Sequence, residues 1–145
     1  MTIYEQQLKS LLSKDYHPIS NYSNFASFIF NEFEDISWAG FYFSNGKYLY
    51  LGPFQGQVAC QTIDFDKGVC GHAFTTKKPV IVSNVHEFPG HIACDAGTNS
   101  ELVIPLFNNN EIIGVLDLDS YKYNRFSKED LILFTKLVDI LMETV

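Results

Sequence analysis

The sequence predicts an α+β domain: helices at both ends pack on one face of a central, mostly antiparallel sheet, and long loops lie on the other face. Two observations support this. Helix-like spacing of apolar residues marks both ends of the chain, and strand-like segments joined by asparagine turns fill its middle. The 145 residues, 46% of them hydrophobic, can bury a substantial core, so we expect one domain over residues 1–145.

Two helices are predicted before the first strand. The first covers residues 3–12, and its apolar face comprises Ile3, Tyr4, Leu8, Leu11 and Leu12. The second covers residues 21–36, and its apolar face comprises Phe25, Phe28, Ile29, Phe33 and Ile36. Asn21 or Ser23 is the predicted N-cap of this second helix, because both side chains can accept a hydrogen bond from the first turn.

The middle of the chain opens with a predicted hairpin. Residues 37–43 and 47–53 are rich in aromatic residues, and the Asn-Gly pair at 45–46 between them is a strong turn signal. A short helix is predicted within residues 67–79, because Gly68 precedes it and Pro79 ends it. A brief strand follows at residues 80–85.

A second hairpin and a last helix complete the pattern. Strands at residues 101–107 and 111–120 flank a polar tip of three asparagines. The helix at residues 126–145 starts with Ser127 as N-cap and Asp130 as its capping-box partner. Its apolar stripe comprises Leu131, Phe134, Leu137, Val138 and Leu141.

Charge and composition exclude several classes of function. The net charge of −7 argues against binding nucleic acid or an anionic membrane surface, which need clustered Lys and Arg. The apolar runs are too short to span a bilayer, and the first 15 residues do not resemble a signal peptide. We therefore expect a cytoplasmic protein. Its odd number of cysteines, three, does not suggest a disulfide scaffold.

The three cysteines lie in loop-like, glycine-bearing sequence. Free cysteines are often buried as small apolar residues, but Cys60, Cys70 and Cys94 all stand outside the apolar runs. The predicted helix start beside Cys70 would lower the pKa of its thiol or bind an anion. Cys94 shares its loop with acids and His91. A set of loop thiols can supply an attacking and a resolving sulfur for redox chemistry.

A zinc site is the competing interpretation of these residues. Six side chains could contribute ligands: Cys60, Cys70, Cys94, His72, His86 and His91. The sequence lacks the short paired spacings that structural zinc sites use, so we expect no metal.

Acidic and aromatic residues are predicted to meet at one end of the sheet. Asp117 and Asp119 alternate along a strand, so they face the same side, and Glu101 begins the partner strand across the hairpin. Mutual repulsion and burial would raise the pKa of at least one carboxyl group and keep a proton available. Such a cluster also suits an ammonium group. Trp38 and Tyr42 share a strand face and could form core packing or an aromatic box.

Several motifs together resemble a known family. The segments GPFQGQVAC, GVCGHA, FPGHIACD, SELVIPL and GVLDLDS are similar to those of the free methionine-(R)-sulfoxide reductases, which are single-domain enzymes with the GAF fold. The resemblance runs from Trp38 to the final helix. GAF domains that act as sensors generally lack this cysteine trio.

The resemblance implies a role for each cysteine. Cys94 matches the attacking thiol, Cys60 the usual resolving thiol, and Cys70 a third thiol that lines the pocket and can exchange disulfides. Whether Cys60 or Cys70 is the main resolving thiol stays open. No bound cofactor is implied; a thioredoxin-like dithiol is the expected electron donor. A second copy of the chain remains a candidate partner.

The resemblance also assigns the acids and the aromatic residues. Glu101, Asp117 and Asp119 match carboxyl groups that engage the sulfoxide oxygen and the substrate's amine. Trp38 and Tyr42 match aromatic residues that enclose the methyl end of the substrate. The acids near Cys94 would then activate the oxygen, although they also disfavour a thiolate. The alternative function is that of a GAF module that binds a small ligand without turnover.

Overall fold

The computed structural model describes residues 1–92 and 94–145 and confirms the predicted α+β architecture. Over these residues, antiparallel strands form one sheet of order β3-β2-β1-β6-β5-β4. The strands are β1 (Trp38–Ser44), β2 (Leu49–Gly56), β3 (Thr62–Ile63), β4 (Val80–Val82), β5 (Ser100–Asn108) and β6 (Glu111–Ser120). The helices are α1 (Ile3–Leu11), α2 (Pro18–Glu32), α3 (Gly68–Thr76) and α4 (Lys128–Met142), with a 3-10 turn at Val85–Glu87.

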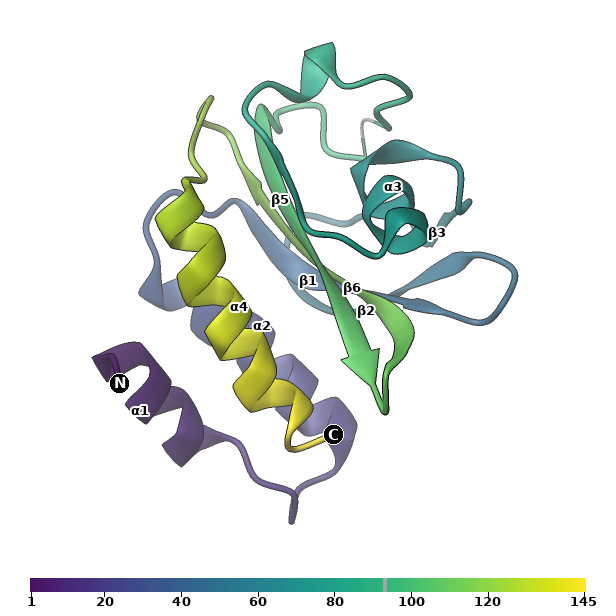
Figure 1. Ribbon diagram of the computed structural model, residues 1–145. Coiled ribbons are helices and arrows are strands. Elements are labelled where there is room, and N and C mark those ends of the chain that lie inside the picture. Colours follow the sequence, from purple (N-terminus) through teal and green to yellow (C-terminus); the bar gives the residue numbers. More distant parts are fainter. Residues whose placement is uncertain (93) are drawn as a thin grey trace.

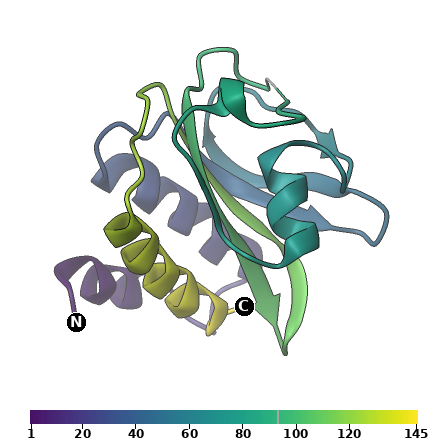
Figure 2. The same ribbon diagram turned by 45° about the horizontal axis from the view of Figure 1, so that its top comes forward.

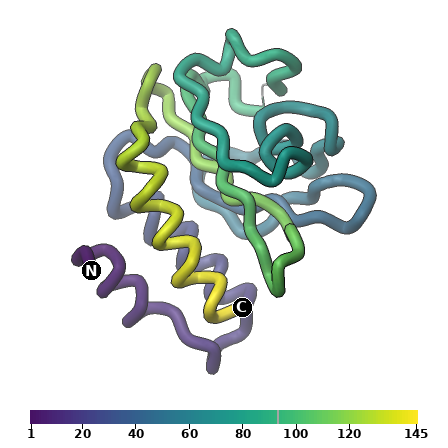
Figure 3. Tube along the Cα trace, in the orientation of Figure 1, coloured from purple at the N-terminus to yellow at the C-terminus, as the bar shows by residue number. Residues whose placement is uncertain are grey.

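The helices divide between the two faces of the sheet. In Figure 1, α1, α2 and α4 lie on one side, whereas α3 and the long loops lie on the other, and the turned view in Figure 2 agrees. The tube in Figure 3 shows the first and last helices of the chain side by side, where α1 packs against α4. None of the described helices has the length and apolar character needed to cross a membrane.

Strand alternation gives each face its own core. Leu116 and Leu118 of β6 point into the larger core beneath α2 and α4, which we call the helix-side core. Val115 points into a smaller core beneath α3, which we call the loop-side core. Asp117 therefore shares the loop-side face with Val115, two residues before it. The long loops and the predicted acids lie on this loop-side face.

The start of the second helix differs from the prediction. The helix begins at Pro18 rather than near residue 21, and His17 is its N-cap, with Nδ1 accepting a hydrogen bond from the amide of Ile19 at 3.0 Å. Proline is favoured in a first helical turn because its fixed φ suits the helix and its missing N–H is not needed there. Asn21 and Ser23 therefore lie inside α2, and the Asn21 amide instead donates to the Ser13 carbonyl.

The predicted face of the first helix is only partly correct. Leu8 and Leu12 are buried, but Ile3 and Leu11 are exposed to solvent. Tyr4 also packs against the helix-side residues, so the packed stripe follows Tyr4, Leu8 and Leu12 at intervals of four.

Both predicted hairpins are present. In the first, the connection spans residues 45–48, with φ of +88° at Gly46. In the second, Asn108 pairs with Glu111, and the turn consists of Asn109 and Asn110 at φ of +52° and +66°. Two successive left-handed residues are typical of a type I′ turn, which suits the twist of a hairpin. This turn fixes which residues of β5 and β6 lie opposite each other.

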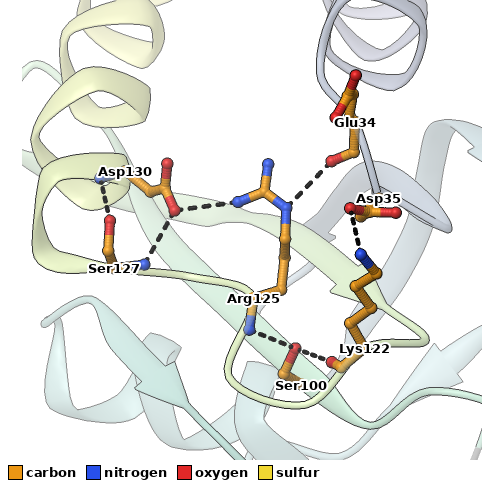
Figure 4. Close-up of polar contacts among 7 residues, drawn as sticks. All are labelled: Glu34, Asp35, Ser100, Lys122, Arg125, Ser127 and Asp130. Atoms are coloured by element: carbon orange, nitrogen blue, oxygen red, sulfur yellow. Dashed lines mark hydrogen bonds and ion pairs between the residues drawn. The ribbon is translucent and has the colours of Figure 1, made fainter.

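Polar contacts hold the β6–α4 connection against the start of β5 (Figure 4). Arg125 donates from Nε to the Glu34 carbonyl and from Nη1 to Asp130, each at 3.0 Å. The Ser100 hydroxyl donates to the carbonyl of Lys122 and accepts from the Arg125 amide. The predicted cap of α4 is confirmed, because Ser127 and Asp130 exchange both capping-box hydrogen bonds. Ser100 is thereby fixed directly before Glu101.

Candidate active site

A row of side chains crosses three adjacent strands on the loop-side face. Asp119 of β6 pairs with Trp38 of β1 on one side and with Glu101 of β5 on the other. Asp117 lies two residues earlier on the same face of β6. Directly opposed residues have Cβ atoms about 5 Å apart, so the carboxyl groups become close neighbours. The structure thus brings the three predicted acids together.

These acids border a narrow pocket between the sheet, α3 and two loops. The sheet supplies the floor, and the first turn of α3 supplies one wall. Two loops supply the rim through Val58, Ala59, His91, Ile92, Cys94, Asp95 and Thr98. The predicted site residues that line it are Trp38, Tyr42, Cys70, Cys94, Glu101, Asp117 and Asp119. Cys60 joins them through a disulfide with Cys94. All eight predicted positions therefore gather at one site.

Burial changes the acid–base behaviour of the carboxyl groups. Burial, followed by the charges of neighbouring acids, raises the pKa of Glu101 and Asp119 well above its usual range. Burial also raises the pKa of Asp117, but hydrogen bonds from Glu101, Cys70 and Asp119 act in the opposite direction. Burial and mutual repulsion thus favour protonated acids in this cluster. The cluster can hold a cation and donate a proton at once.

The free cysteine contradicts one expectation. Cys70 lies in the first turn of α3, but its thiol is buried, with only 3% of the residue exposed. Burial, and then the charges of Asp117 and Glu101, raise the pKa of this thiol, whereas the helix start was predicted to lower it. The dipole of a short helix is outweighed by desolvation beside acids. Cys70 remains a neutral thiol, with Sγ 4.0 Å from Oε2 of Glu101.

The other two cysteines form a disulfide. Cys60 and Cys94 are bonded, and their Cα atoms lie 5.4 Å apart although 34 residues separate them in the chain. The bond joins the two rim loops at the mouth of the pocket. Since the prediction left open whether Cys60 or Cys70 pairs with the attacking thiol, this is the pairing that the structure contains.

The two aromatic residues also support the loop that carries Cys60. Trp38 and Tyr42 stack with ring centroids 5.9 Å apart. The Trp38 indole donates to the carbonyl of Gln57 at 3.1 Å, and the Tyr42 hydroxyl donates to the carbonyl of Cys60 at 2.9 Å. The indole needs space beside β2: a Cβ at Gly40 would lie 2.7 Å from the Trp38 ring and 2.3 Å from Phe54. The aromatic pair thus both lines the pocket and positions a rim loop.

Among further lining residues, the sequence predicted no role for Asp95 and Thr98 and indicated His91 only as a possible zinc ligand. His91, Asp95 and Thr98 all border the pocket. Asp95 organises its loop: its carboxylate accepts from the Gly97 amide and from the Tyr121 hydroxyl, each at 2.9 Å. The pattern Asp95-x-Gly97 could have indicated this turn, because aspartate commonly accepts from the amide two residues on. No sequence signal marked Thr98.

The zinc hypothesis does not fit the geometry. Two of its six proposed ligands form the disulfide, and His86 shares a hydrogen bond with Asn99 at 2.8 Å. Within the described residues, one group of three potential ligands lies within 4.8 Å of one another, namely Cys70, Glu101 and Asp117. Of the six proposed ligands, only Cys70 belongs to it. A metal there would have to displace protons that burial stabilises.

The cysteine arrangement predicts a specific labelling pattern. When oxidised native protein is alkylated, digested and analysed by mass spectrometry, we expect a peptide pair linking Cys60 to Cys94, with Cys70 labelled only after unfolding. The buried position of Cys70 limits access of the reagent. A bridge that includes Cys70, or rapid labelling of Cys70 in the folded protein, would contradict this.

The buried acids should cost stability at neutral pH. Because the pKa of Asp119 is raised, the folded state binds more protons than the unfolded state above pH of about 4, so stability falls as pH rises from there through the folded pKa. Replacing Asp119 with Asn removes this penalty. We expect the melting temperature at pH 7 to rise by about 2–4 °C per kcal/mol gained, and the gain to vanish near pH 4.

The matched control is Glu111→Gln, at the exposed end of the same strand. It should move the melting temperature by no more than about 1–2 °C at either pH. A lower melting temperature for Asp119→Asn at pH 7 would mean that the carboxylate stabilises the fold instead.

Comparison with known proteins identifies the class to which this fold belongs. A family model described as GAF domain matches residues 22–143. The fold is therefore that of a GAF domain.

Individual relatives identify a family within the GAF-domain class. A free methionine-R-sulfoxide reductase of Saccharomyces cerevisiae is 45% identical over 131 residues, which cover 85% of this chain and 73% of the yeast protein. The enzyme of the same name from Escherichia coli is 42% identical over 125 residues, covering 86% and 76%. The structure of free methionine-R-sulfoxide reductase from Neisseria meningitidis in complex with its substrate has a TM-score of 0.90 and 35% identity, covering 97% and 85%. The chain belongs to the free methionine-R-sulfoxide reductase family.

Proposed function

We propose that this protein reduces free methionine-R-sulfoxide to methionine. The observation that carries the proposal is the disulfide Cys60–Cys94 at the mouth of a pocket floored by Glu101, Asp117 and Asp119. This arrangement places a pair of sulfurs suited to redox chemistry beside acids that remain protonated. The relatives named above and the substrate complex of one of them support the same activity.

The proposed reaction conserves atoms and electrons. The thiolate of Cys94 attacks the sulfoxide sulfur, the oxygen passes to Cys94 as a sulfenic acid, and methionine leaves. The Cys60 thiol then attacks the sulfenic sulfur, which releases water and forms the disulfide. Two thiols are oxidised and one sulfoxide is reduced. A thioredoxin-like dithiol restores both thiols by exchange.

Each acid has a proposed task in this reaction. Glu101 and Asp119, whose raised pKa keeps them protonated, donate to the sulfoxide oxygen and make its sulfur electrophilic. Asp117, whose Oδ1 has no hydrogen-bond partner within the described residues, accepts the ammonium group of the amino acid. Trp38 and Tyr42 enclose the methyl end against the loop-side core. Cys70 stays neutral and donates to Glu101, which leaves Cys60 as the resolving thiol.

A steady-state assay tests this function. Reduced protein is mixed with thioredoxin, its reductase and NADPH, and the R and S epimers of free methionine sulfoxide are compared with an R-sulfoxide inside a blocked peptide. We expect NADPH consumption with the free R epimer alone. Binding of methionine without any turnover would favour the alternative of a GAF binding module.

A further inference from the structure

The pocket borders two polar atoms that lack a hydrogen-bond partner within the described part of the protein. They are Oδ1 of Asp117 and Oγ1 of Thr98. Both residues are more than nine-tenths buried, at 6% and 4% exposure. A buried hydroxyl without a partner is costly, so such atoms in a pocket mark places where a ligand supplies the missing hydrogen bond. One of them accepts hydrogen bonds, and the other can donate.

The pocket is also poor in positive charge. Among the described residues that line it there is no lysine or arginine, while four acids line it. A free amino acid brings a carboxylate as well as an ammonium group, and a carboxylate cannot lie against ionised acids. Its partners must therefore be neutral donors. His91, the one histidine of the lining, is partly exposed, and burial lowers its pKa, so it favours the neutral form.

The side-chain hydroxyls in the lining are few. The Tyr42 hydroxyl donates to the Cys60 carbonyl and is therefore committed to the fold. Thr98 is the other hydroxyl, and its backbone is fixed by a bond from its amide to the Asp95 carbonyl at 3.1 Å. The same loop is tied to the end of β6, where the Asn99 amide donates to the Ser120 carbonyl at 2.8 Å. Thr98 is thus a rigidly held donor.

We infer that the Thr98 hydroxyl is a substrate-positioning group that donates a hydrogen bond to the carboxylate of the free amino acid. The inference rests on the proposed function and deepens it. The ammonium lies at Asp117, the sulfoxide oxygen at the protonated acids, and the carboxylate at Thr98. A methionine sulfoxide within a peptide has no free carboxylate at that position, so Thr98 contributes to selection of the free amino acid.

The test compares Thr98→Val, which keeps the shape and removes the hydroxyl, with Thr98→Ser, which keeps the hydroxyl. For free methionine-R-sulfoxide we expect Thr98→Val to raise KM by on the order of 10- to 100-fold, the cost of a hydrogen bond to a charged group, with a much smaller change in kcat. Thr98→Ser should restore most of the affinity. With 3-(methylsulfinyl)propylamine, which lacks the carboxylate, the valine variant and the wild type should differ by less than about threefold.

Ser37→Ala is the matched control, because Ser37 Oγ is another buried hydroxyl without a partner but does not line this pocket. It should leave KM unchanged. Melting temperatures separate effects on binding from effects on folding. Because the Thr98 hydroxyl is buried without a partner within the described residues, its removal in Thr98→Val should not lower the melting temperature.

Two outcomes would overturn the inference. In the first, Thr98→Val has the same KM as the wild type for free methionine-R-sulfoxide. In the second, Thr98→Val raises KM by the same factor for the substrate that lacks the carboxylate. Titration of methionine, followed by Trp38 fluorescence, keeps the proposed function separate. If wild-type protein binds methionine but reduces nothing, the proposed function fails, and the ratio of Kd values for Thr98→Val and wild type still decides the role of Thr98. If the wild type neither reduces the sulfoxide nor binds methionine, both fail.

Discussion

Replacing Cys94 with serine is expected to lower kcat for free methionine-R-sulfoxide by at least about 1,000-fold, because a serine hydroxyl cannot act as the sulfur nucleophile. The substitution removes one sulfur from the Cys60–Cys94 pair and keeps nearly the same volume at the mouth of the pocket. Binding of methionine should persist, since the acids and the aromatic residues are retained. Steady-state kinetics and fluorescence titration together measure both effects.

Cys60→Ser is the comparison that isolates the attacking thiol. It should slow steady-state turnover with thioredoxin and yet form about one methionine per protein in a single turnover, because the sulfenic acid still forms. Cys94→Ser should form none. If Cys94→Ser keeps more than about a tenth of wild-type kcat, another thiol is the nucleophile.

The second large effect is expected at Glu101. Glu101→Gln keeps the size of the side chain but cannot transfer a proton, so kcat should fall by about 10²- to 10⁴-fold. Because burial raises the pKa of Glu101, the wild-type acid stays protonated at pH values where an exposed glutamate is ionised. Wild-type activity should therefore persist on the acidic side and decline as pH rises through that raised pKa. In Glu101→Gln, this decline of kcat with rising pH should be weaker. The pH profiles of kcat for both proteins measure the difference.

Glu111→Gln is a suitable control, because it changes an exposed glutamate at the far end of the same hairpin. It should retain kcat within about twofold. A fall of less than about threefold for Glu101→Gln would remove Glu101 from proton transfer and leave Asp119 as the donor.

The sequence was sufficient to predict the row of acids. Two local rules carry that prediction: residues i and i+2 face the same side of a strand, and the asparagine turn sets the register of the hairpin. In the structure, Glu101 indeed lies opposite Asp119. The hairpins and the cap of α4 were predictable for the same reason, since each depends on residues a few positions apart.

Features that depend on tertiary packing could not be predicted in this way. The raised pKa of Cys70 follows from burial against Glu101, 31 residues away, which outweighs the local effect of the helix start. In the sequence, nothing distinguishes Thr98 from other loop threonines. Only the structure shows that its hydroxyl is buried without a hydrogen-bond partner within the described residues. The predicted start of α2 was wrong for a different reason. Asn21 is a good capping residue, but Pro18 sets the first turn.

The most direct measurement is a single turnover without any external reductant. Fully reduced protein is mixed with one equivalent of free methionine-R-sulfoxide, and both methionine and the cysteine bridges are quantified. We predict about one methionine per protein, a bridge between residues 60 and 94, and Cys70 recovered as a thiol. Methionine formed without that bridge, or no methionine at all, would contradict the proposed role of this disulfide.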